Sequence, residues 1–168
     1  ANGEMPDIAS ILQQFPGDAL LCVRPSSEDP DWGGPGAVLN IGMNAAKLAV
    51  LKTRLGERAA CSIYIRFVQS YAINVARLDP DMFDDIEGET QEALTESLRA
   101  YEAELEEPFP MDPKIQLAGV LTSMARAWEG TSARLLREAK GAPADAGLGL
   151  VVQEMALGLG HGESGSGV

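Results

Sequence analysis

Residues 19–25 read Ala-Leu-Leu-Cys-Val-Arg-Pro, a short apolar run that ends on a charged residue and a proline. Such a run is typical of a buried strand, and the proline ring holds the preceding Arg24 in extended backbone. We therefore predict a strand over Ala19–Arg24. The apolar runs Ala37–Ile41 and Leu148–Met155 predict two more strands, so that strand segments lie near both ends of the chain.

The stretch between the last two strands predicts helices. Asn44, Thr90 and Asp112 each precede a run with apolar residues at helical spacing, and their side chains are suited to cap a helix. Pro113 fits the first helical position after Asp112. Besides a short amphipathic segment over Ile8–Leu12, the predicted helices cover Asn44–Gly56, Tyr64–Val75, Pro80–Ile86, Thr90–Pro108, Asp112–Trp128 and Thr131–Lys140.

This order of elements predicts an α+β fold that is predominantly helical. Residues 1–43 are expected to form part of a small sheet with a loop, and residues 44–146 an inserted helical lobe. Residues 147–168 are expected to return to the sheet with a strand and a Gly-rich segment. The length of 168 residues and the apolar content of 45% suit one domain with a hydrophobic core.

Composition argues against nucleic acid and membrane as partners. The formal net charge is -12 at pH 7, whereas nucleic-acid binding depends on clustered Lys and Arg. The longest apolar stretches, such as Leu148–Val152, are far shorter than the ~20 residues that cross a bilayer. The sequence lacks a charged start followed by an apolar run, which is the pattern that indicates export. Cys22 and Cys61 stand in apolar surroundings, which predicts two buried free thiols in a cytoplasmic protein.

Three residues on the predicted strands are candidates for a ligand site. Arg24 ends a strand beside a loop, where its guanidinium with five donors is suited to grip phosphate oxygens. An ordinary surface or salt-bridged arginine is the commoner explanation of the same pattern. Gln153 and Met155 alternate on the last strand and therefore face the same side, where they would suit an adenine slot. Packing in the core or on the surface is again the commoner role.

The Gly-rich segment over residues 158–167 offers a second type of ligand contact. Gly160, Gly162 and Gly165 match the dinucleotide fingerprint letter for letter, but that fingerprint needs a following helix and a complete βαβ unit, which the sequence does not supply. Unhindered backbone N–H groups and the hydroxyls of Ser164 and Ser166 are able to cradle phosphates if the segment is ordered. A flexible tail is equally consistent with the composition.

The order of several short segments resembles the N-terminal region of pyruvate, phosphate dikinases. The segments are Leu21-Cys-Val-Arg24, Val38-Leu-Asn-Ile-Gly42, Tyr64-Ile-Arg-Phe-Val-Gln-Ser-Tyr71, Phe109-Pro-Met-Asp-Pro113, Trp128, Pro143, Val152-Gln-Glu-Met155 and Ser164-Gly-Ser-Gly-Val168. Together they cover nearly the whole chain with family-like spacing. The combination is specific, although each segment alone is weak.

The resemblance implies an ATP-grasp-like nucleotide domain, which transfers a phosphoryl group from ATP to a histidine on a separate swivelling domain. By position, Arg24 corresponds to a family arginine that contacts the ATP phosphates, so that it is the implied catalytic residue. Gln153 and Met155 fall on the strand that lines the adenine pocket. The implied nucleotide-binding residues are Arg24, Gln153, Met155, Ser164, Gly165, Ser166 and Gly167.

The same resemblance implies that the chain is an internal piece of a larger phosphotransferase and is inactive alone. ATP would be used with Mg²⁺, but the acidic Mg²⁺ ligands, the phosphorylated histidine and the pyruvate-binding barrel are expected outside the chain. We accordingly predict no metal site here, and His161 is not in the context of the family's phosphohistidine. The implied partners are ATP, the swivelling phosphohistidine domain and a second copy of the parent protein.

The loop Pro25–Gly36 departs from the family pattern. Pro25-Ser26 replaces Ser-Gly after the arginine, and Pro30-Asp-Trp-Gly-Gly-Pro-Gly36 replaces Ser-Met-Pro-Gly-Met-Met-Asp. The altered loop supports an alternative hypothesis, in which the chain is a catalytically inactive nucleotide-sensing or protein-interaction module. A third hypothesis is a helical domain whose likeness to dikinases is only ancestral.

Overall fold

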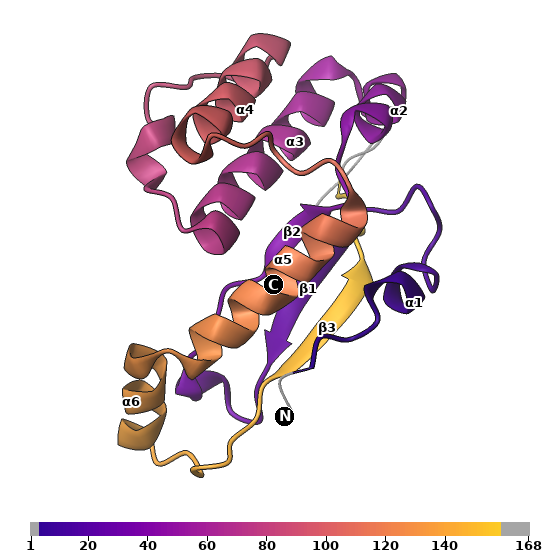
Figure 1. The fold of residues 1–168 in the computed structure, drawn as a ribbon. Helices are drawn as coiled ribbons and strands as arrows, with labels where there is room; N and C mark the ends of the chain where they lie inside the picture. Colours follow the sequence, from indigo (N-terminus) through magenta and orange to yellow (C-terminus); the bar gives the residue numbers. More distant parts are fainter. Residues whose placement is uncertain (1–3, 159–168) are drawn as a thin grey trace.

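A three-stranded antiparallel sheet forms the centre of the computed structural model, which describes residues 4–158 (Figure 1). Strand β1 (Leu21–Ser26) lies in the middle, between β2 (Val38–Ile41) and β3 (Gly149–Glu154). The helices between β2 and β3 in sequence are therefore inserted between two strands of one sheet. All three predicted strands are confirmed, and so is the mainly helical α+β class.

Strand β1 extends further than the sequence predicts, through Pro25 to Ser26. The expected end at Arg24 is wrong because pairing with β3 continues to Ser26. Pairing with β2 stops at Val23, which lies opposite Val38. Beyond that point it pairs with β3 alone, and Pro25 lies opposite Leu150. Proline lacks a backbone N–H but is tolerated where one side of a strand is unpaired.

Residues 4–158 contain six α-helices, and none of them is long and apolar enough to cross a membrane. Short 3-10 turns occur at Pro30–Trp32 and Pro80–Phe83, and a π-helical turn follows α3 at Ala72–Ala76. The α-helices are α1 (Ile8–Leu12), α2 (Ala45–Leu55), α3 (Glu57–Tyr71), α4 (Gln91–Leu105), α5 (Pro113–Glu129) and α6 (Thr131–Ala139).

The predicted helix caps are confirmed. The side chains of Asn44, Thr90 and Asp112 accept hydrogen bonds from backbone N–H groups in the first turns of α2, α4 and α5. The apolar stripe that begins at Tyr64 lies on α3 and the turn after it, and the helix itself begins earlier, at Glu57. Gly56 has a φ of 84° and lies between α2 and α3. Since glycine adopts a positive φ at little cost, the chain turns there without a linker.

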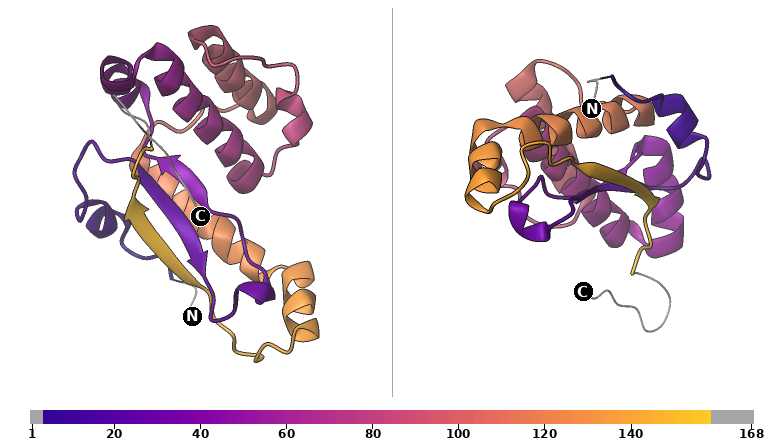
Figure 2. Two further views of the ribbon diagram at one scale, coloured as in Figure 1. Left: turned by 180° about the vertical axis from the view of Figure 1, so that it is seen from behind. Right: turned by 90° about the horizontal axis from the view of Figure 1, so that it is seen from below.

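Helix α5 crosses one face of the sheet, while α2, α3 and α4 form a lobe beside it (Figures 1 and 2). Gln116 of α5 is fully buried and joins the two parts through its side-chain amide. Its Oε1 accepts from the backbone N–H of Gly42 at 2.7 Å, and its Nε2 donates to the carbonyls of Met43 at 2.9 Å and Pro110 at 2.7 Å. The amide therefore fixes the chain where it leaves β2.

An aromatic cluster around Phe109 holds the helical lobe together. The Phe109 ring lies edge-on to Tyr64, Phe67, Tyr71 and Tyr101, with ring centroids 5.1–6.4 Å apart. Such edge-to-face contacts are favourable because the positive edge of one ring meets the negative face of another. Burial raises the pKa of Tyr64 and of Tyr71 to about 12. The cluster connects α3 and α4 with the segment that leads into α5.

Candidate nucleotide site

The two faces of the sheet differ in what covers them. Leu21 and Val23 are buried in the hydrophobic core, which β1 and β2 share with α5. In the view from behind in Figure 2, β1 and β3 lie in front of α5, so that none of the described helices covers their opposite face; we call it the open face, although the Cys22 side chain on it is buried. Side chains alternate between the faces along a strand. Arg24 therefore lies on the open face, and it is exposed.

The open face brings together two of the residues singled out by sequence. Arg24 pairs with Val151 of β3, and the neighbouring same-face residue of β1, Cys22, pairs with Gln153. Directly paired residues point to the same side, so that Arg24 and Gln153 are diagonal neighbours on this face. Burial raises the pKa of the Cys22 thiol, against the opposing influence of the Arg24 charge and a hydrogen bond from Gln153.

Arg24 keeps its charge available on this surface. The ion pairs found among residues 4–158 involve Lys52, Arg58 and Arg66, not Arg24. A guanidinium on a paired strand has a fixed backbone position and five N–H donors, which is the donor arrangement that carboxylate and phosphate groups require. The position thus suits an anionic ligand.

Met155 lies just past the end of β3 and still continues its hydrogen bonding. Its backbone N–H donates to the carbonyl of Leu20 at 2.8 Å. The side chain is half-buried and lines a hollow of about 180 Å³, whose wall includes Leu20, Leu51 and Arg54. The structure therefore places Met155 beside a recess with both apolar and charged lining at one end of β1, and Arg24 toward the other end.

The remaining predicted contacts, Ser164, Gly165, Ser166 and Gly167, lie outside the described residues.

Comparison with known proteins adds an evolutionary relationship. The chain is 30% identical over 167 residues to pyruvate, phosphate dikinase of Rhizobium meliloti (strain 1021) and 28% identical over 168 residues to that of Clostridium symbiosum. It is also 27% identical over 166 residues to chloroplastic pyruvate, phosphate dikinase 1 of Zea mays. The chain is a distant homologue of the pyruvate, phosphate dikinases. Each match covers 89% of the chain, and the chain spans only 18–19% of the relatives' length. No family model matches the chain.

The loop that departs from the dikinase pattern is packed against α6. Asp29 caps the 3-10 turn Pro30–Trp32, and the Trp32 side chain is buried. Gly33 has a φ of 69°, and a methyl group in place of its hydrogen would lie 2.8 Å from Leu136 of α6. Sequence alone predicted a loop here. The structure shows that one side of that loop is held by α6.

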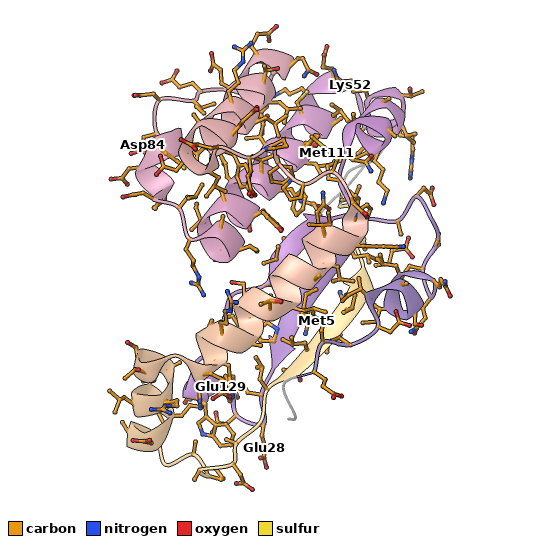
Figure 3. All side chains as sticks on the ribbon, in the orientation of Figure 1. Met5, Glu28, Lys52, Asp84, Met111 and Glu129 are labelled. Atoms are coloured by element: carbon orange, nitrogen blue, oxygen red, sulfur yellow. The ribbon has the colours of Figure 1, made fainter. Side chains whose placement is uncertain are left out.

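Acidic residues do not converge on a metal site in the described part of the chain. Within residues 4–158 no group of three or more His, Cys, Asp or Glu side chains is placed to hold a metal ion. Glu28, near the end of β1, and Asp84, in the helical lobe, are far apart in Figure 3.

Sequence reasoning missed Lys47, which lies between two hollows at the start of α2. Its ammonium group donates to the carbonyl of Ala19, and burial lowers its pKa. Gly42 leaves room for this group, since a Cβ at that position would lie 2.9 Å from Nζ. In the sequence, only the glycine five residues before the lysine could have indicated this contact. That spacing is too general to support a prediction by itself.

Proposed function

We propose that this chain forms one wall of the ATP site of a pyruvate, phosphate dikinase-like phosphotransferase. In this proposal the domain is ATP-grasp-like, and the parent protein passes a phosphoryl group from ATP to a histidine on a separate swivelling domain. The observation that carries the proposal is the exposed Arg24 on the open face of the sheet, diagonal to Gln153. Distant homology to dikinases along most of the chain supports it.

The open face and the recess beside Met155 offer groups for the two ends of a nucleotide. Arg24 would bind the phosphates through charge-assisted hydrogen bonds, and it would stabilise the negative charge that develops during transfer. The amide of Gln153 and the recess beside Met155 would take the adenine. Met155 bonds to Leu20, which directly precedes β1 and lies four residues before Arg24, and four residues of extended chain span about 13 Å. An extended nucleotide has a comparable length.

Phosphoryl transfer needs positioning more than covalent chemistry from the protein. The backbone of Arg24 is paired with Val151 of β3, and this support would hold the phosphates in one orientation relative to the incoming histidine. Mg²⁺ would neutralise phosphate charge during the reaction. We propose that its ligands, like the phosphohistidine domain and a second copy of the parent, belong to other parts of the assembly.

Titration calorimetry of the intact protein with MgATP tests this proposal. Charge-assisted hydrogen bonds contribute ~1.5–3 kcal/mol, so that Arg24→Ala should weaken MgATP binding by about 10- to 100-fold. Arg134→Ala, on the exposed surface of α6, is the matched control and should leave the affinity unchanged. An Arg24→Ala protein that binds MgATP as tightly as the wild type would contradict the proposal.

A second candidate is a catalytically inactive module that senses nucleotide or binds another protein. The packing of Trp32 and Gly33 against α6 favours it, because a loop held in this way is less free to close over a nucleotide. Incubation of the intact protein with γ-labelled ATP, followed by an assay for acid-labile phosphohistidine, separates the two candidates. Robust labelling supports the phosphotransferase, whereas MgATP binding without labelling supports the inactive module.

A further inference from the structure

Lys47 of α2 reaches back to the chain that leads into β1. Its Nζ donates a hydrogen bond to the carbonyl of Ala19. A Cβ at Gly42 would lie 2.9 Å from Nζ, so that the ammonium group lies directly against the backbone just after β2. The side chain is half-buried between these two segments. The amine is therefore held in one place, where α2 meets the sheet.

The amine lies at the wall of an apolar hollow of about 150 Å³. Lys47 lines this hollow together with Ala19 and Gly42, the two residues that contact its Nζ. Among the described residues, Lys47 supplies the one polar side chain of the lining. The other side chains around the hollow are apolar, namely Leu12, Phe15, Pro16, Leu21, Ile41 and Pro113.

The charge on Lys47 is poorly compensated. The ion pairs found among residues 4–158 do not include Lys47. Burial lowers its pKa, although the negative charge of Asp18 acts in the opposite direction. Asp18 and Arg54 are the charged residues that share the neighbouring hollow with it. A half-buried ammonium loses its proton more readily than an exposed one, and a neutral lysine amine in an apolar pocket is a nucleophile.

We propose that Lys47 is a modification site that accepts a short aliphatic acyl group from an acyl phosphate. The neutral amine attacks the acyl carbon, the C–O bond to phosphate breaks, and inorganic phosphate leaves with the electron pair. The amine loses one proton to solvent. In the resulting amide, the remaining N–H still donates to Ala19 and the alkyl chain lies in the apolar hollow. Acylation thereby removes the uncompensated charge.

The hollow contains none of the residues assigned to the nucleotide. The proposal therefore stands independently of ATP binding.

The three other lysines of the chain are internal references. Lys52 is ion-paired with Glu57, whereas Lys114 and Lys140 are exposed. The 168-residue chain is incubated with acetyl phosphate at neutral pH, and mass spectrometry measures the acetylation rate at each lysine. Lys47 should react several-fold faster than the two exposed lysines. A lysine with a purely structural role, half-buried and bonded to a carbonyl, would react more slowly than both, and that result would overturn the proposal.

The apolar hollow predicts a preference for a longer acyl chain. Butyryl phosphate differs from acetyl phosphate by two CH₂ groups. Their burial should raise the ratio of butyrylation to acetylation about tenfold at Lys47 relative to Lys114. The comparison with Lys114 corrects for the intrinsic reactivity of the two reagents. Equal ratios at the two lysines would show that the hollow does not take the acyl chain, and would contradict the proposal.

Leu12→Trp assigns this preference to the hollow. The larger ring fills space between α1 and the amine, so that the ratio at Lys47 should fall to that at Lys114. Gln13→Trp, at the exposed neighbouring position, is the matched control and should keep the preference. A preference that persists in Leu12→Trp with a wild-type circular dichroism spectrum would refute the assignment. If Leu12→Trp does not fold, the comparison of the two reagents on the wild-type chain still decides.

Discussion

Replacing Gln116 by leucine tests how the sheet and the helical lobe are joined. The substitution keeps most of the side-chain volume and removes the hydrogen bonds to Gly42, Met43 and Pro110. Gly42 and Met43 are buried, so that water cannot replace their lost partner, whereas Pro110 is partly exposed. Two unpaired buried groups at ~1–3 kcal/mol each place the loss of stability at about 2–6 kcal/mol.

We expect a loss of about 3 kcal/mol, because burial of the leucine side chain offsets part of the cost. Urea unfolding followed by circular dichroism measures it. With a slope of ~2 kcal/mol/M, the midpoint should fall by about 1.5 M. Gln13→Leu, at an exposed position beside α1, should stay within about 0.5 kcal/mol of the wild type. A Gln116→Leu protein as stable as Gln13→Leu would refute the role given to this amide.

Two further predictions concern the helical lobe. Phe109→Ala should cost about 3–5 kcal/mol, since it empties the centre of the aromatic cluster; thermal unfolding measures it, and a loss below ~1 kcal/mol would contradict the cluster's role. Hydrogen bonds from Ser62 and Arg58 make the pKa of Glu89 lower in the folded protein than in the unfolded chain. Ionised Glu89 therefore stabilises the fold at pH values above its unfolded-state pKa. This contribution is lost as the pH falls through the folded-state pKa. Wild-type stability should therefore decline more steeply below the ordinary pKa of 4.5 than that of Glu89→Gln, and parallel urea midpoints of the two proteins would contradict this.

Local signals in the sequence predicted the elements well. Asn44, Thr90 and Asp112 mark helix starts because a cap involves only the next few residues. The apolar runs that become β1 and β3 are also local, and their pairing places Arg24 and Gln153 on one face. Local signals thus predicted most of the elements, whereas only the resemblance to dikinases implied that Arg24 and Gln153 share a site.

Contacts between distant segments could not be predicted in the same way. Phe109 lies between two prolines and reads as part of a helix break, yet its ring packs against residues from α3 and α4. The burial of Asn40 in β2 depends on the register between β1 and β2, which no single segment specifies. Gln116 looks like an ordinary helix residue until its partners near Gly42 are in place.

Titration of the isotope-labelled chain with MgATP, followed by amide NMR shifts, tests the central claim most directly. If the open face of the sheet is a wall of an ATP site, the largest shifts should fall on β1 and β3 around Arg24 and Gln153, and they should disappear in Arg24→Ala. Shifts confined to α4 or α6, or shifts on β1 and β3 that persist unchanged in Arg24→Ala, would contradict the claim.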